Sequence, residues 1–308
     1  MSNQPQEKNI VSNPSAKKAI DYGLSTPERF VQKKKKKRIA LVLFSVGFLG
    51  CSMLAILAYL GRTSGDFTIQ LGEGKTLLTM ATDTGFSDST SFLKAKGLER
   101  SVTWSADLLP QDSELDSSTG GSKNGSYSTS MTTTLDSYLA YTFFVRNDST
   151  DSVDYLVNLS IDNYVNPVNE SSSLLDILRV RLFENSVYNG SDLTHNMATY
   201  AMKSNSPYTL PDGSEEAREC IGKCIVHSDG SKDYSVATKP ENRGFASAFV
   251  DNSNVFNTVH ENLKVSGIVR YTIVMWLEGD DPDCTGQAPK NAYITFSMHF
   301  DVLTGSKT

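Results

Sequence analysis

The stretch Val153–Ile161 (VDYLVNLSI) places an apolar side chain at every second position, with Asp154, Asn158 and Ser160 among the residues between. This two-residue period is typical of a strand with one buried and one exposed face. Ile294–Val302 (ITFSMHFDV) repeats the pattern near the C-terminus. Both stretches predict long strands of an antiparallel sheet.

Other stretches extend the same fold class. Leu139–Arg146 (LAYTFFVR) and Ile268–Leu277 (IVRYTIVMWL) are apolar on both faces, which is typical of central strands. Shorter strands are expected at Arg179–Glu184 (RVRLFE), and at Asp66–Leu71 and Thr76–Ala81 as a pair joined around Gly72–Gly74.

Few stretches favour helices in this part of the chain. The best are Ser171–Leu178 and Ser214–Cys224, both short. Gln111–Ser130 has no apolar period and is rich in Ser and Gly, which predicts a long exposed loop. We therefore expect residues 61–308 to form an antiparallel β-sandwich with one or two short helices.

A different segment precedes this domain. Ile39–Leu60 (IALVLFSVGFLGCSMLAILAYL) is 22 residues long and carries no charge, enough for a helix that crosses a bilayer core of about 30 Å. Six cations stand directly before it, namely Lys33, Lys34, Lys35, Lys36, Lys37 and Arg38. This bias predicts a single-pass protein of the cell membrane, with residues 1–38 as a disordered basic cytoplasmic tail and the C-terminal domain extracellular. Cleavage of the helix as a signal and lipid attachment at Cys51 stay open as alternatives.

Charge is distributed unevenly along the chain. The first 38 residues carry a net charge of +7, whereas residues 61–308 carry −13. An acidic globular domain repels phosphate, so we expect no nucleic-acid partner. The expected partners are the lipid bilayer, through residues 39–60, and an unknown extracellular protein or polymer.

Three cysteines follow the apolar segment: Cys220, Cys224 and Cys284. An exported domain permits disulfides, and we expect Cys220 or Cys224 to pair with Cys284. A zinc site that adds His227 to the three cysteines is the alternative.

The WLEGDDPDC stretch, residues 276–284, contains four acidic residues: Glu278, Asp280, Asp281 and Asp283. Clustered carboxylates suit calcium, which takes six to eight oxygens, but the spacing does not match an EF-hand loop. The simpler interpretation is a solvated turn, so we expect no metal or other cofactor, with calcium as the alternative. The rim around Trp276, Glu278 and these aspartates is the first place to look for a ligand.

Catalytic motifs are scarce. The histidines are His195, His227, His260 and His299, and the chain contains neither a GxSxG elbow nor a nucleotide-binding glycine motif. The stretch His260–Lys264 (HENLK) has Lys264 where a zinc protease requires a second histidine. We therefore predict no catalytic residues and no enzymatic activity.

Three stretches carry a family resemblance: Thr142–Asn147 (TFFVRN), Arg179–Glu184 (RVRLFE) and Tyr271–Cys284 (YTIVMWLEGDDPDC). They resemble a largely uncharacterised group of Gram-positive bacterial membrane-anchored surface proteins. The order of basic tail, helix and GDFTIQL is similar to the plan of that group. More remotely, the chain is similar to the TasA/camelysin class of exported β-sandwiches, some of which assemble into extracellular fibres. It differs from that class in a helix without a clear cleavage site and in lacking the second histidine.

Together these features predict a non-catalytic, membrane-anchored cell-surface protein whose β-sandwich serves binding or envelope structure. One alternative is a TasA/camelysin-like fibre or matrix subunit that is exported by a cleaved signal. The other alternative is an exported hydrolase without a recognisable motif, which would need polar groups gathered around a histidine.

Overall fold

The computed structural model describes residues 67–72, 77–99, 101–110, 120–128, 133–166, 173–189, 195–209, 215–284 and 292–303, without the side chains of residues 205–209, 215 and 216. The chain divides into two units, 1–60 and 61–308, and all described residues belong to the second. The predicted tail and the predicted membrane helix at 39–60 lie outside these residues. Within the described ranges, no helix has the length and apolar character needed to span a membrane.

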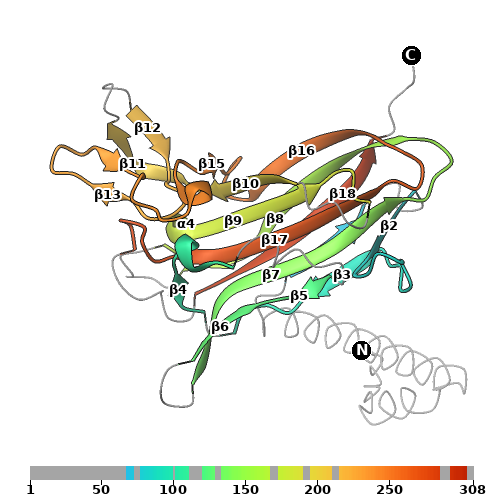
Figure 1. Cartoon of the computed structure of the whole chain (residues 1–308), viewed down its shortest axis with the longest axis horizontal. Helices are drawn as coiled ribbons and strands as arrows, with labels where there is room; N and C mark the ends of the chain where they lie inside the picture. Colours follow the sequence, from blue (N-terminus) through green and yellow to red (C-terminus); the bar gives the residue numbers. More distant parts are fainter. Residues whose placement is uncertain are drawn as a thin grey trace, which may run out of the picture. The chain divides into compact units, whose positions relative to one another are not determined.

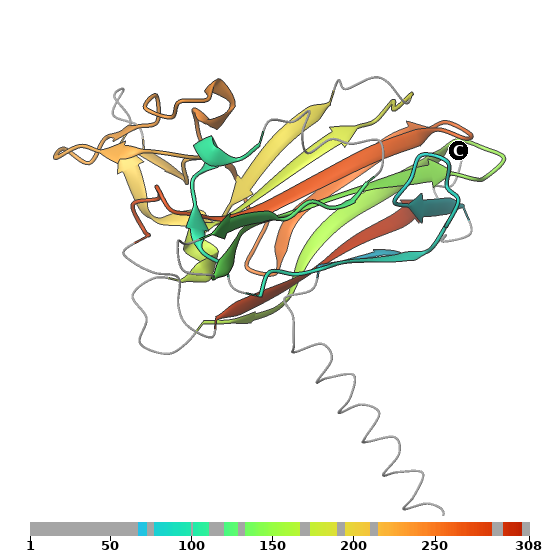
Figure 2. The ribbon, with the colours of Figure 1, turned by 60° about the horizontal axis from the view of Figure 1, so that its bottom comes forward.

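Two sheets dominate the described part and are stacked face to face (Figures 1 and 2). The smaller has five strands in the order β16 (Asn254–Leu263), β8 (Val153–Val165), β18 (Tyr293–Leu303), β1 (Phe67–Leu71) and β3 (Phe92–Ala95). The larger has nine strands, whose main path is β15 (Ser247–Ala248), β10 (Asn196–Ala201), β9 (Leu178–Asn185), β17 (Ile268–Glu278), β7 (Thr134–Asn147) and β2 (Leu78–Ala81). The remaining three are β4 (Thr103–Trp104) beside β17, and β5 (Gly121–Ser122) and β6 (Gly125–Ser128) beside β7. The predicted sandwich of mainly β structure is therefore confirmed.

Smaller elements complete the fold. Two short ribbons are formed by β11 (Lys203–Thr209) with β12 (Glu215–Arg218), and by β13 (Ile225–Val226) with β14 (Lys232–Asp233). The described helical segments are α4 (Leu174–Ile177), η1 (Ala106–Leu108) and η2 (Pro240–Asn242). Figure 1 shows β11, β12 and β13 at the end of the sheets where α4 leads into β9.

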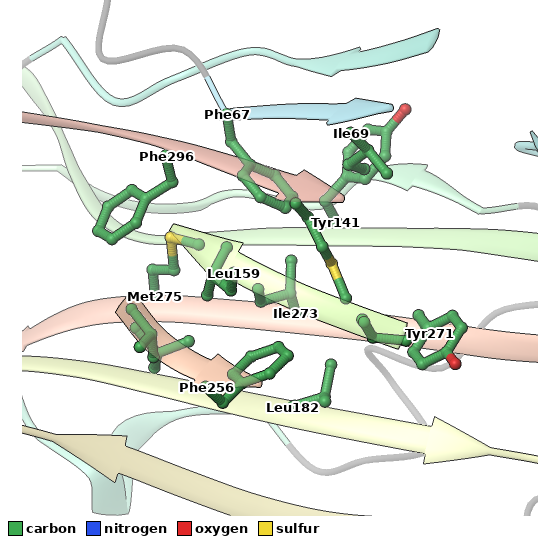
Figure 3. Packing of buried hydrophobic residues seen from close by; sticks show 14 of the residues in the cluster. Phe67, Ile69, Tyr141, Leu159, Leu182, Phe256, Tyr271, Ile273, Met275 and Phe296 are labelled. Atoms are coloured by element: carbon green, nitrogen blue, oxygen red, sulfur yellow. The ribbon is translucent and has the colours of Figure 1, made fainter. Parts of the chain in front are cut away.

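The core lies between the sheets, where the alternating strands direct their apolar faces. All five apolar positions of the Val153–Ile161 stretch are buried, and so are the last four of Ile294–Val302. The central position of β17, between β9 and β7, explains why its run is apolar on both faces. Side chains from both sheets interlock in this core (Figure 3), among them Phe67, Leu159, Phe296, Tyr141, Ile273 and Met275.

The pairing of the first strands differs from the prediction. β1 and β2 lie in different sheets: β1 pairs with β18 in parallel and with β3, whereas β2 pairs with β7. The apolar faces of β1 and β2 therefore meet across the core rather than side by side. Parallel pairing also joins β4 to β17 and β10 to β15, so the sandwich is not purely antiparallel.

Two local predictions are wrong. Within Ser214–Cys224, residues Glu215–Arg218 form strand β12 instead of a helix, because main-chain pairing with β11 outweighs the weak preference of so short a segment. Within Gln111–Ser130, the predicted loop is wrong for β5 and β6, which pair with β7, whereas 111–119 and 129–130 lie outside the described residues. That pairing uses main-chain groups, and a side chain at Gly125 would come within 2.1 Å of the Tyr138 ring, so the glycine that suggested a loop permits the strand. The short helix predicted at Ser171–Leu178 is confirmed as α4.

Candidate functional site

Glu278, the last residue of β17, is an internal carboxylate. It is 0% exposed and accepts hydrogen bonds from the Ala106 amide (2.9 Å), the Trp276 indole (2.8 Å) and the Asp280 amide (3.0 Å). Burial raises its pKa, against the lowering effect of the Trp276 bond. Trp276 is 1% exposed, so the predicted ligand-facing rim around Trp276 and Glu278 is wrong.

Asp280 holds the segment that leads into η1. It accepts a hydrogen bond of 2.6 Å from the Ser105 hydroxyl, and Ser105 in turn accepts from the Asp107 amide as the cap of η1. Asp107 then accepts from the Thr238 amide (2.7 Å) and the Asn242 side chain (2.9 Å). The loop after β17 thus ties η1 and, through it, residues 238–242 to the end of the larger sheet.

Asp281 forms a buried ion pair with Arg179, near the start of β9. The two side chains are 1% and 0% exposed. Arg179 also donates from Nε to the Cys220 carbonyl at 2.9 Å, and Asp281 accepts from the Asp283 amide at 2.7 Å. A buried charge is stable only when an opposite charge and further hydrogen bonds compensate for its removal from water, and both are present here. The pair therefore joins the start of β9, the loop after β17 and the segment around Cys220.

Glu219 is the residue that the sequence interpretation missed. It offers a carboxylate oxygen that lies with one each of Asp281 and Asp283 in a group whose members are all within 4.8 Å of one another. Lys232 Nζ lies 3.4 Å from Glu219 Oε2, with both side chains almost fully buried. Of the four predicted calcium candidates, the structure therefore brings Asp281 and Asp283 together with Glu219, whereas Glu278 and Asp280 serve other contacts.

We call the six residues Asp176, Arg179, Glu219, Lys232, Asp281 and Asp283 the charged junction. Burial raises the pKa of Asp176, and the neighbouring carboxylates Glu219 and Asp281 raise it further. The pKa of Asp283 is raised in the same way, by burial and then by Asp281. Glu219, Asp281 and Asp283 are the residues here that could hold a cation, but Arg179 and Lys232 already contact two of them. The junction is thus crowded with charge of both signs, which is typical of a structural clamp.

The cysteines are connected differently from the prediction. Cys220 and Cys224 form a disulfide with each other, and Cys284 lies outside it. The expected link from this segment to Cys284 is therefore wrong, and so is the zinc alternative, because two of its ligands are in the disulfide. The connection between the segment and the end of β17 exists nonetheless, through Arg179, Asp281 and the Cys220 carbonyl. We call residues 219–243, which contain the disulfide, the β13–β14 ribbon and η2, the disulfide lobe.

A second polar cluster lies inside the sandwich. His260 Nδ1 is 3.2 Å from Glu184 Oε1, and the His260 ring is stacked on Tyr155 with the ring centroids 5.1 Å apart. The Tyr155 and Tyr271 hydroxyls are hydrogen bonded at 2.8 Å. This cluster gathers polar groups around a histidine, as the hydrolase alternative requires. The sequence marked His260 only through its HENLK context and gave no sign of Glu184, which is seventy-six positions away.

The other histidines have separate surroundings. His195 contacts the Phe183 ring edge-on at 5.0 Å, and His299 Nε2 lies 3.3 Å from the Gln70 amide. His227 is exposed on the disulfide lobe. The structure therefore does not bring these three together.

Comparison with known proteins does not assign the chain to a family. No protein-family model matches the chain, and no curated protein matches it. Among solved structures, the chain is similar to TmCBM61, determined in complex with β-1,4-galactotriose, at 8% identity and a TM-score of 0.20 over 78% of this chain and 91% of the other. The resemblance to Gram-positive surface proteins stays a prediction.

Proposed function

We propose that this chain is a single-pass cell-surface protein whose outer β-sandwich binds an extracellular partner without catalysis. In this proposal residues 39–60 cross the membrane, residues 1–38 face the cytoplasm, and the disulfide lobe is the binding surface. The charged junction carries the proposal, because it fixes the lobe to the end of the larger sheet with buried contacts. A surface that is ordered before binding loses less entropy when a partner arrives.

The exposed side chains of the lobe favour a protein as the partner. Ile225 and Val226 of β13 are 43% and 46% exposed, and Tyr234 is 36% exposed. Because neighbouring residues of a strand point to opposite sides, the β13–β14 ribbon presents an apolar side chain on each face. Aromatic and apolar groups in a polar surround are what protein interfaces use.

Binding is tested with the full-length protein and envelope material isolated from the cells that produce it. The double variant Ile225→Ser/Val226→Ser is compared with Val250→Ser/Val265→Ser, which removes two exposed valines outside the lobe. We expect the first variant to lose about fivefold or more in retained protein, and the second to match the wild type. Equal retention of all three would contradict a role for the lobe. Protease treatment of the envelope identifies the partner class, since retention that survives it indicates a polymer.

Anchoring is tested separately by the intact mass of the protein extracted from membranes. An unprocessed chain supports the proposal that residues 39–60 anchor the protein in the membrane. An N-terminus near Gly61 would replace it with a secreted subunit, and a diacylglycerol on Cys51 with a lipoprotein. Surface digestion of intact cells should remove residues 61–308 and leave the tail; protection of the sandwich would contradict an extracellular position.

A fibre or matrix subunit is the second candidate, and the sheet edges favour it. β16 and β3 end the five-stranded sheet, and among the described strands each pairs on one side only. Such an edge can accept a strand from another molecule. Under this candidate, Val259→Lys on β16 abolishes sedimenting assemblies, whereas Val265→Lys, outside the strand, preserves them. Absence of assemblies in the wild type would leave the anchored receptor-like function.

A further inference from the structure

Glu184 and His260 connect the two sheets through the core. Glu184 lies on β9 of the larger sheet and His260 on β16, the edge strand of the smaller one. Their side chains are 11% and 17% exposed, with Glu184 Oε1 and His260 Nδ1 3.2 Å apart. Glu184 continues the row of inward-facing apolar residues formed by Leu178, Val180 and Leu182. A carboxyl group therefore occupies a position where this strand otherwise carries core side chains.

The groups that face this pair are mainly neutral. Tyr155 comes from β8, Tyr271 from β17 and Tyr200 from β10, and burial raises the pKa of all three. They stay protonated at physiological pH. β18 contributes the apolar ring of Phe300, stacked on Tyr155.

The carboxylates nearest along these strands are exposed to solvent. Glu261 follows His260 on β16, and Asp154 on β8 accepts a hydrogen bond from the Asn262 amide. Because both are exposed, water screens their charges, and the direct contact between Glu184 and His260 dominates the charge state of the pair.

We propose that Glu184 and His260 share one proton and act as a proton-responsive latch, which fastens edge strand β16 to the larger sheet at mildly acidic pH and loosens as the pH rises. With one proton the pair is neutral overall and retains a hydrogen bond. With none, a carboxylate is buried beside a neutral imidazole; with two, an imidazolium is buried beside a neutral acid. Both of these states place a net charge in the core.

The direction follows from the two groups separately. Burial raises the pKa of Glu184 from 4.5 to about 7, so its contribution to stability is fully present below pH 4.5 and is lost as the pH rises through 7. Burial lowers the pKa of His260 from 6.5, so its contribution is present above 6.5 and is lost as the pH falls through the lower native value. The latch is therefore tightest between the lowered pKa of His260 and the raised pKa of Glu184.

Hydrogen exchange on the full-length chain tests the latch, with peptides from β16 compared with peptides from β3, the opposite edge. After correction for the intrinsic exchange rate, we expect the opening equilibrium of β16 to increase about three- to fivefold between pH 6 and pH 9, because the raised pKa of Glu184 causes an increase that the lowered pKa of His260 offsets in part. β3 should not respond. Glu184→Gln should abolish this increase in the opening of β16, and Glu261→Gln, at an exposed carboxyl on the same strand, should preserve it.

A second variant keeps the test decisive if Glu184→Gln does not fold. His260→Gln can still donate a hydrogen bond to Glu184. Its β16 should therefore lose protection against exchange at alkaline pH, as in the wild type, but should keep it at acidic pH. A wild-type β16 whose protection is constant from pH 6 to pH 9 would overturn the latch. The same holds for a Glu184→Gln variant that responds like the wild type.

Discussion

Two of the buried ionisable residues on strand β9, Arg179 and Glu184, have different kinds of partner. Arg179, near its start, contacts Asp281 on the outer face of the larger sheet; Glu184, near its end, contacts His260 in the core. A guanidinium is a permanent cation in proteins, and that of Arg179 also has the Cys220 carbonyl as an acceptor. Glu184 has as partner a side chain whose own charge depends on pH. The partner, more than the burial, therefore decides whether a buried ion is a permanent clamp or a proton-responsive contact.

The largest effect is expected where the clamp is broken. Asp281→Asn leaves the Arg179 guanidinium buried without its carboxylate, which typically costs about 3–5 kcal/mol in the free energy of unfolding. Asp148→Asn is the matched control: it breaks an ion pair with Arg146 whose side chains are about one-third exposed, and it should cost about 0–1 kcal/mol. Denaturant unfolding of both variants measures the difference. Equal costs would show that the charged junction is not a clamp, and the contrast between the two ends of β9 would disappear.

The next effect concerns Glu278, which supports the same end of the sandwich. Glu278→Gln retains the shape but replaces one acceptor oxygen with an NH₂ group that faces a donor. With the Gln oxygen in the place of Oε2, the Ala106 amide and the Trp276 indole keep their acceptor, but the Asp280 amide loses its own, so we expect a loss of about 2–3 kcal/mol. Glu241→Gln, at an exposed carboxyl in η2, is the control and should be neutral. A neutral Glu278→Gln would mean that the loop does not depend on this carboxylate.

A smaller effect is expected from the disulfide. Closing so short a loop restricts the unfolded chain by about 2 kcal/mol in the chain-entropy description, so Cys220→Ala/Cys224→Ala should lower stability by about that amount. Reduction of the wild type should have the same effect, and Cys284→Ala should leave the link between Cys220 and Cys224 intact in peptide mass mapping. A peptide that links Cys284 to either of the other two would contradict the structure.

The strands of this fold could be predicted from the sequence, but their neighbours could not. The alternation in Val153–Ile161 and Ile294–Val302 depends on local burial, and both became strands of the core. The partner of β1 depends on β18, more than two hundred residues away, and nothing within Asp66–Ala81 records it. Likewise, β5 and β6 are held by main-chain hydrogen bonds to β7, and such bonds require no alternation of apolar residues in the sequence.

The candidate site was predictable in part for a similar reason. Asp281 and Asp283 stood out as a cluster, but Arg179 and Glu184 were hidden in RVRLFE, where the apolar residues alone defined the strand. Glu219 was one acid among several in a segment that favoured a helix. The charged junction forms only when the ends of β9 and β17 and the disulfide lobe are brought together, and such nonlocal contacts leave no spacing rule in the chain.

Calcium gives the smallest expected effect and the finest test of the clamp. Asp281 and Glu219 already contact Arg179 and Lys232, so the wild type should gain almost no stability from calcium. Lys232→Met removes one cation and leaves the three carboxylate oxygens within 4.8 Å of one another, a set that a divalent ion can neutralise. That variant should be less stable without calcium and recover about 1.4 kcal/mol at a calcium concentration ten times its Kd. Lys264→Met, at an exposed cation, is the control and should show neither change. Stabilisation of the wild type by calcium would instead mean that the charged junction binds an ion beside Arg179 and Lys232. The clamp at the start of β9 would then depend on a ligand.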